Sequence, residues 1–245
     1  MLLVVVAVAV TLLLMRQNDD DIPLLNLPGE SEQTDPQGTE SQAETETQTQ
    51  TTVQAEDSPD AIILSDGLQI LGIDNYAGMY MEDESNETVA DVMMILVENV
   101  SDKDLQLARV NMVYSDFTAQ FEITNLPAGE KIIVLEKNRH SGAGEAHQSV
   151  TTDNVVFFDE PMNIHGESLR FSGSNGILEV RNISEKDISG NIYVYYKSSA
   201  ADLLYGGITF RVVIEGGLPA GQTVQLFTGH YSPETSRIIS VVYGE

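Results

Sequence analysis

The chain has 245 residues, with 38 acidic side chains, 12 lysines and arginines, and no cysteine or tryptophan. A formal net charge of −26 argues against sequence-independent nucleic-acid binding, because contacts to phosphates need a surface rich in Lys and Arg. The absence of cysteine excludes disulfide scaffolds, thiolate metal sites and Cys nucleophiles. A hydrophobic share of 42% is enough for a packed core, so a wholly disordered chain is excluded too.

An apolar run opens the sequence at residues 1–15, and Thr11 is its one polar side chain. A helix of that length spans about 22 Å, short of the roughly 30 Å core of a bilayer. A buried core helix is disfavoured because the run has no polar stripe. We expect residues 1–16 to be a transmembrane anchor that begins upstream, or the apolar region of a signal peptide. Either alternative places residues 17–245 outside the cytoplasm, and the anchor predicts a single-pass protein of the cell membrane.

Residues 17–60 form an acidic segment rich in Thr, Gln and Glu. The first 60 residues contain 12 acidic side chains against one basic side chain, Arg16, which gives a net charge of −11. Such a segment cannot bury enough apolar surface to offset its ordering entropy, so we predict a disordered linker that lifts a domain off the membrane. A binding tail for cationic partners and a glycosylated stalk are the alternatives. The aspartates at 19–21 favour an exported flank, whereas Arg16 weakly opposes it.

The remaining chain contains an internal repeat. Residues 97–105 read VENVSDKDL and residues 180–188 read VRNISEKDI, an offset of 83. Residues 126–130 read LPAGE and residues 218–222 read LPAGQ, an offset of 92. Two markers in the same order predict tandem domain copies. The difference, 92 − 83 = 9, predicts an insertion in the second copy, which we place around residues 198–202.

Both copies have the pattern of β-strands. Apolar and polar side chains alternate at residues 118–124 and again at 208–215, as in half-buried strands. No segment after residue 60 carries a capped stripe of helical period, and turn signals separate short strands at intervals of about 8–12 residues. We therefore expect an all-β fold with two tandem immunoglobulin-like β-sandwich domains, module 1 at 61–140 and module 2 at 150–245.

The order of turns and strands resembles the FxLYD-type domains, small immunoglobulin-like modules of bacterial envelope and secreted proteins. The resemblance covers residues 92–137 and 176–228 and is carried by the Asn-x-Ser-x-Lys-Asp and Leu-Pro-Ala-Gly turns. Residues 113–116 keep the Tyr and Asp of the signature strand but lack its Phe and Leu, and residues 195–197 lack the Asp as well. The resemblance implies a fold and an envelope location, and it brings no shared catalytic residues.

Histidines are the first candidates for chemistry. His140 and His147, together with Glu145, lie in a Gly-rich connector and are metal-ligand residue types. Their spacing fits no known ligand pattern, so we expect a solvated linker between the modules. His165 and His230 are expected at strand ends, on the surface or partly buried.

Carboxylates and hydroxyls give no stronger candidates. The acidic cluster at 82–87 offers oxygen ligands for calcium but lacks the spacing of a calcium loop, so we expect a solvated hairpin tip. Residues 171–176 have their glycines at the wrong offsets for a nucleophile elbow, and no glycine precedes a lysine as in a phosphate-binding loop. The sequence therefore predicts no catalytic, cofactor-binding or metal-binding residue.

These features together predict a non-catalytic, membrane-anchored extracytoplasmic protein. Its tandem modules are expected to bind or space a protein or polymer partner at the bacterial cell envelope, with no nucleic acid involved. An extracytoplasmic sensor or regulatory subunit of a membrane complex is the main alternative. An enzyme with a pocket between the modules and a calcium-dependent adhesin are two further alternatives.

Overall fold

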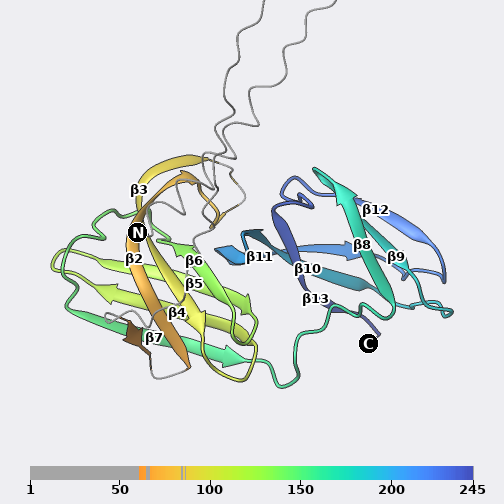
Figure 1. Ribbon diagram of the computed structural model, residues 1–245, viewed down its shortest axis with the longest axis horizontal. Coiled ribbons are helices and arrows are strands. Elements are labelled where there is room, and N and C mark those ends of the chain that lie inside the picture. Colours follow the sequence, from red (N-terminus) through yellow and green to blue (C-terminus); the bar gives the residue numbers. More distant parts are fainter. Residues whose placement is uncertain (1–60, 65–66, 84, 86, 245) are drawn as a thin grey trace, which may run out of the picture. The chain divides into compact units, whose positions relative to one another are not determined.

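The structure of the protein is a computed structural model that describes residues 61–64, 67–83, 85 and 87–244 (Figure 1). The predicted anchor at 1–16 and linker at 17–60 lie outside the described residues. Within the described ranges the chain forms thirteen β-strands and no helix, which confirms the all-β class. None of the described segments is a helix long and apolar enough to cross a membrane.

The first half of the described chain contains two sets of antiparallel strands. Strands β2, β3 and β6 are neighbours in one sheet, with the short β1 at its edge, while β5, β4 and β7 form a separate sheet. The strands are β1 (Ile62–Ile63), β2 (Leu68–Met79), β3 (Thr88–Asn99), β4 (Leu105–Val113), β5 (Thr118–Leu126), β6 (Lys131–Leu135) and β7 (Ser149–Phe157).

The second half repeats this arrangement strand for strand. Strands β8, β9 and β12 take the places of β2, β3 and β6, and β11, β10 and β13 take those of β5, β4 and β7. The strands are β8 (Leu169–Ser174), β9 (Ile177–Asn182), β10 (Ile192–Ala200), β11 (Leu203–Ile214), β12 (Thr223–Phe227) and β13 (Ser236–Val242). The sequence repeat therefore reflects a repeated strand order.

Each half has its own hydrophobic core, formed by side chains from both of its sheets. In β5, Ala119, Phe121 and Ile123 are buried while the residues between them are not, as the alternating pattern predicts. The first core includes Leu68, Ile70, Met93, Ile95, Val97, Val110, Met112, Phe121, Ile123, Ile132 and Val134. The second includes Leu169, Leu178, Val180, Ile192, Val194, Tyr196, Phe210, Ile214 and Val241.

Asn99 closes the turn that carries the first marker of the repeat. Its Nδ2 donates to the carbonyl oxygens of Lys103 at 2.9 Å and Leu126 at 3.0 Å, and its Oδ1 accepts from the Ser101 hydroxyl at 2.6 Å. Since Leu126 begins the Leu-Pro-Ala-Gly marker, one buried side chain ties the two markers together.

Asn182 does the same in the second half. Its Nδ2 donates to Lys186 O at 2.8 Å and Leu218 O at 2.9 Å, and its Oδ1 accepts from the Ser184 hydroxyl at 2.7 Å. Asn99 and Asn182 are both 0% exposed. The repeated motif is thus a structural corner, and its Asn-x-Ser pattern offers no accessible amide for glycosylation in the folded protein.

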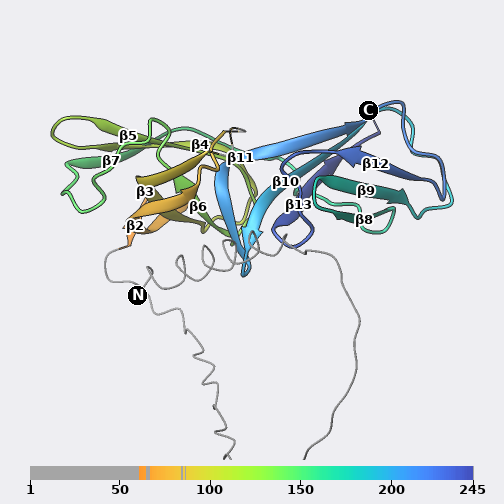
Figure 2. The same cartoon turned by 90° about the horizontal axis from the view of Figure 1, so that it is seen from above.

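Strand β11 belongs to both halves. It pairs with β10 near both of its ends, and Leu204 and Tyr205 also pair in parallel with Ile132 and Ile133 of β6. Leu204 packs in the first core. The strands β1-β2-β3-β6-β11-β10-β13 therefore form one seven-stranded sheet (Figure 2). The β10–β11 hairpin continues past a bulge to the pair Ala200–Leu203, and this extension has no counterpart in the β4–β5 hairpin. The predicted insertion is this extension.

The boundary between the halves differs from the expected one. Strand β7 pairs with β4, and Val150, Val155 and Phe157 pack against the first core. Residues 149–157 thus belong to the first half, although module 2 was expected to begin at residue 150. The Gly-rich stretch at 139–147 is the loop that leads into the last strand of the first half, and a composition shift alone does not distinguish such a loop from a linker.

Candidate binding groove and the junction beneath it

Glu82 comes from the loop between β2 and β3 and anchors that loop to two other strands. Its carboxylate accepts the backbone N–H of Leu135 at 2.8 Å and the backbone N–H of Gly207 at 3.0 and 2.8 Å. Burial raises the pKa of this carboxyl above its ordinary value, and the backbone donors work against that shift. The expectation of a solvated tip is therefore wrong for Glu82.

Lys197 lies at the bulge of β10 and is 0% exposed. Its Nζ donates to the carbonyl oxygens of Gly206 at 3.2 Å, Gly207 at 2.9 Å and Ile208 at 2.7 Å. An ammonium has three N–H donors and a neutral amine only two, so this site matches the charged form. Burial lowers the pKa of Lys197, and the attraction of Glu82 opposes that shift.

The peptide groups of Gly207 are held from several sides. Its N–H donates to the Glu82 carboxylate. Its carbonyl oxygen accepts from Lys197 Nζ and from the Thr124 hydroxyl, the latter at 2.8 Å. A Cβ at Gly207 would collide with the backbone carbonyl oxygen of Glu122. Only glycine fits here, because the neighbouring atom belongs to backbone and cannot move aside. Residues 82, 124, 197, 207 and 209 are called the junction below.

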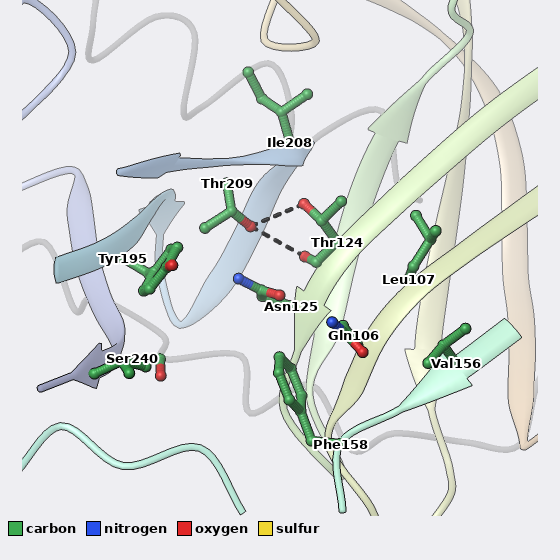
Figure 3. A pocket seen from close by; sticks show the side chains of 11 residues that line it. Gln106, Leu107, Thr124, Asn125, Val156, Phe158, Tyr195, Ile208, Thr209 and Ser240 are labelled. Atoms are coloured by element: carbon green, nitrogen blue, oxygen red, sulfur yellow. Dashed lines mark hydrogen bonds between the residues drawn. The ribbon is translucent and has the colours of Figure 1, made fainter. Parts of the chain in front are cut away.

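Two threonines complete the junction at its surface. The hydroxyl oxygens of Thr124 and Thr209 are 2.9 Å apart, and the Thr209 hydroxyl also lies 3.2 Å from the Thr124 carbonyl oxygen (Figure 3). A peripheral ion pair, Arg237 with Glu130 at 3.0 Å, links the same two halves. Both of its side chains are about one-third exposed, so it contributes less than about 1 kcal/mol and the buried contacts dominate.

A groove of about 630 Å³ lies over the two threonines and is lined by both halves (Figure 3). Its lining residues are Gln106, Leu107, Thr124, Asn125, Val156, Phe158, Tyr195, Ile208, Thr209, Ser240 and Val242. None of them is Asp, Glu, Lys, Arg or His. Residues 61–245 contain 26 acidic and 11 basic side chains, so an uncharged surface of this size stands out from the rest of the molecule.

Four polar side chains of the groove have unused hydrogen-bonding groups. Within the described part of the chain, the side chains of Gln106, Asn125, Tyr195 and Ser240 make no hydrogen bond to another residue. Ser240 is only 7% exposed, and its hydroxyl borders the groove. Because a buried or half-buried polar group is costly without a partner, Ser240, Asn125 and Tyr195 favour a bound molecule or ordered water, whereas Gln106 is exposed to solvent.

The four histidines all pack against aromatic rings. The ring centroids are 4.6 Å apart for His140–Phe117, 6.4 Å for His147–Tyr114, 4.5 Å for His165–Tyr243 and 4.7 Å for His230–Phe210. The connector histidines are thus partly packed rather than simply solvated. No cluster of three His, Asp or Glu side chains suited to a metal ion occurs among the described residues.

The other acidic residues of the 82–87 cluster pair with a cation. Asp83 and Glu87 contact the Arg139 guanidinium at 3.1 and 2.6 Å, and that guanidinium lies 4.4 Å from the Tyr80 ring centroid. The Arg139 side chain thereby neutralises two carboxylates that the sequence offered as calcium ligands. Glu84 and Asn86 lie outside the described residues.

The most informative junction residue, Lys197, was not identified from the sequence. It directly follows residues 192–196, which read IYVYY and have no polar face. A charged side chain that continues such a strand, followed by Gly206-Gly207 in the inserted hairpin, is the signal that could have found it. The groove itself has no sequence signal.

The comparisons with known proteins give no relative from which a site could be transferred. The chain matches no family model, and neither the curated proteins nor the solved structures give a significant match.

Proposed function

We propose that this protein is a non-catalytic, membrane-anchored component of the bacterial cell envelope that holds a partner in the groove. The observation that carries the proposal is the groove itself, an uncharged surface with four free polar side chains between two halves. Its volume of about 630 Å³ falls within the range of typical ligand sites, about 300–1,000 Å³. The junction beneath it fixes the strands that present those side chains.

The lining chemistry supports binding over catalysis. General acid–base catalysis needs a titratable side chain within hydrogen-bonding reach of the substrate. Among the described lining residues, the Tyr195 hydroxyl is the one group that can lose a proton, and it has no adjacent base in the lining. The groove therefore suits recognition, with hydrogen bonds and apolar contacts as its means.

The apolar run at 1–15 and the acidic linker at 17–60 support the extracytoplasmic, membrane-anchored part of the proposal. The repeated strand order and the two equivalent Asn corners support reading the halves as immunoglobulin-like sandwiches of the FxLYD type. Protease added to intact cells should cut within residues 17–60. Full protection of that segment, with cleavage only after lysis, would argue against export.

Obstruction of the groove tests the binding role. Gln106 is exposed on β4, so Gln106→Trp places a large ring in the groove without disturbing a core. Thr223→Trp, at an exposed position of β12, is the matched control. The immobilised full chain should capture envelope components that the Gln106→Trp protein loses and the Thr223→Trp protein keeps. Equal capture by all three proteins would place the partner elsewhere.

A further inference from the structure

The chemistry of the groove restricts the class of molecule that fits it, and this inference rests on the proposed function. The lining has no charged side chain, so a cationic ligand would lack a carboxylate and an anionic ligand would lack a basic partner. An anion would also meet the long-range repulsion of a strongly acidic molecule. The occupant is therefore uncharged.

The polar side chains of the groove require an occupant rich in hydrogen-bonding groups. The amides of Gln106 and Asn125 each offer two N–H donors and one acceptor oxygen. The hydroxyls of Tyr195 and Ser240 can each donate and accept a hydrogen bond. A purely apolar ligand would cover these groups without satisfying them, and covering a donor or acceptor without a partner is unfavourable. A neutral ligand with many hydroxyl or amide groups satisfies them.

Two aromatic side chains give the groove an apolar surface of defined shape. Tyr195 comes from β10 in the second half and Phe158 follows β7 in the first half, and Figure 3 shows Asn125 drawn between them. Flat rings beside amide groups suit a molecule that has C–H faces as well as hydroxyl edges. Sugar rings have both.

We infer that the groove binds an uncharged oligosaccharide. One sugar ring packs against Tyr195 or Phe158, and its hydroxyls bond to the amides of Gln106 and Asn125 and to the Ser240 hydroxyl.

Isothermal titration of the full chain with neutral hexasaccharides tests this inference. The probes are hexamers of β-linked N-acetylglucosamine, β-linked glucose and α-linked glucose, with an oligogalacturonate as the anionic control and a neutral Ser/Thr nonapeptide as the peptide control. We expect at least one neutral hexasaccharide to bind and both controls to fail. No binding by any neutral hexasaccharide at millimolar concentration, or binding of the peptide alone, would overturn the inference.

Substitutions locate the binding. Tyr195→Thr and Gln106→Ala should each weaken saccharide binding by about tenfold or more. Tyr193→Thr is the matched control, since Tyr193 lies on the same strand two residues away and outside the groove lining. Unchanged affinity in both groove variants would place the sugar elsewhere, and Gln106→Ala, at an exposed position, keeps the test valid if Tyr195→Thr unfolds. If the groove still captures an envelope component but binds no saccharide, the oligosaccharide inference is refuted while the proposed binding role of the groove stands.

Discussion

Replacement of Lys197 by Met is the sharpest test of the junction. Met has a similar length but no donor, so the carbonyls of Gly206 and Ile208 lose the one side-chain donor that the structure assigns to them. The Gly207 carbonyl still accepts the Thr124 hydroxyl, and the Glu82 carboxylate keeps its backbone donors. Each of the two carbonyl groups left without a donor costs about 1–3 kcal/mol. We expect Lys197→Met to lower the free energy of unfolding by about 2–6 kcal/mol.

The companion substitution Glu82→Gln shows whether the two groups act together. An amide oxygen in the place of Oε1 still accepts the N–H groups of Leu135 and Gly207, while the NH₂ group in the place of Oε2 faces the Gly207 N–H, so the single change costs about 1–3 kcal/mol. In the double variant neither charge is left uncompensated. We therefore expect the double variant to be more stable than the sum of the single changes predicts, by at least about 1 kcal/mol.

Urea denaturation of the full chain, followed by far-ultraviolet circular dichroism, measures these differences. Lys186→Met is the matched control, because Lys186 is exposed at the Asn182 corner and uses only its backbone there. Its effect should stay within about 0.5 kcal/mol. A loss of less than about 1 kcal/mol for Lys197→Met, or strict additivity with Glu82→Gln, would refute the role assigned to the pair.

Three further predictions concern other features. Gly207→Ala should lower the free energy of unfolding by about 3 kcal/mol or more, because the new Cβ collides with backbone. Gly129→Ala has no atom near its Cβ and should lower it by about 1–2 kcal/mol because of the positive φ. Equal losses in urea denaturation would contradict the steric reasoning. Asn182→Ala leaves the Leu218 carbonyl without its side-chain donor, while the Lys186 carbonyl keeps the Ser184 hydroxyl, so the loss should be about 1–3 kcal/mol by the same assay. A loss under about 0.5 kcal/mol would show that the corner is dispensable. Burial raises the pKa of Tyr80 to about 12, while the phenol of the unfolded chain has a pKa of about 10, so the folded state binds the proton more tightly. The free energy of unfolding should therefore fall as the pH rises from about 10 towards 12. Tyr80→Phe should make this fall with pH less steep, and an unchanged pH dependence would exclude Tyr80 as its source.

The local structure was accessible from the sequence because its signals are local. Alternation of apolar and polar residues predicted β5 and the second part of β11, and the repeated turn residues predicted corners at Asn99 and Asn182. Each signal depends on neighbours along the chain, which obey a fixed strand period and fixed turn chemistry. The duplication then doubled the information, since each marker occurs twice.

The junction and the groove were not accessible because both depend on contacts between distant segments. Glu82 looks like any acidic loop residue until Gly207, 125 positions later, supplies its donor. The parallel pairing of β6 with β11 arises from the inserted hairpin, which has no counterpart in the first copy to compare with. The assignment of residues 149–157 to the first half likewise depends on a long-range pairing with β4.

The central claim is that the junction holds the two halves as one body and so forms the groove. Because the chain has no cysteine, Ala128→Cys in the first half and Glu185→Cys in the second, both exposed, give two unique sites for spin labels. Double electron–electron resonance then measures the distance distribution between them. We predict one narrow distribution that broadens when Lys197→Met is added. A distribution equally broad with and without Lys197 would contradict a groove built on this junction.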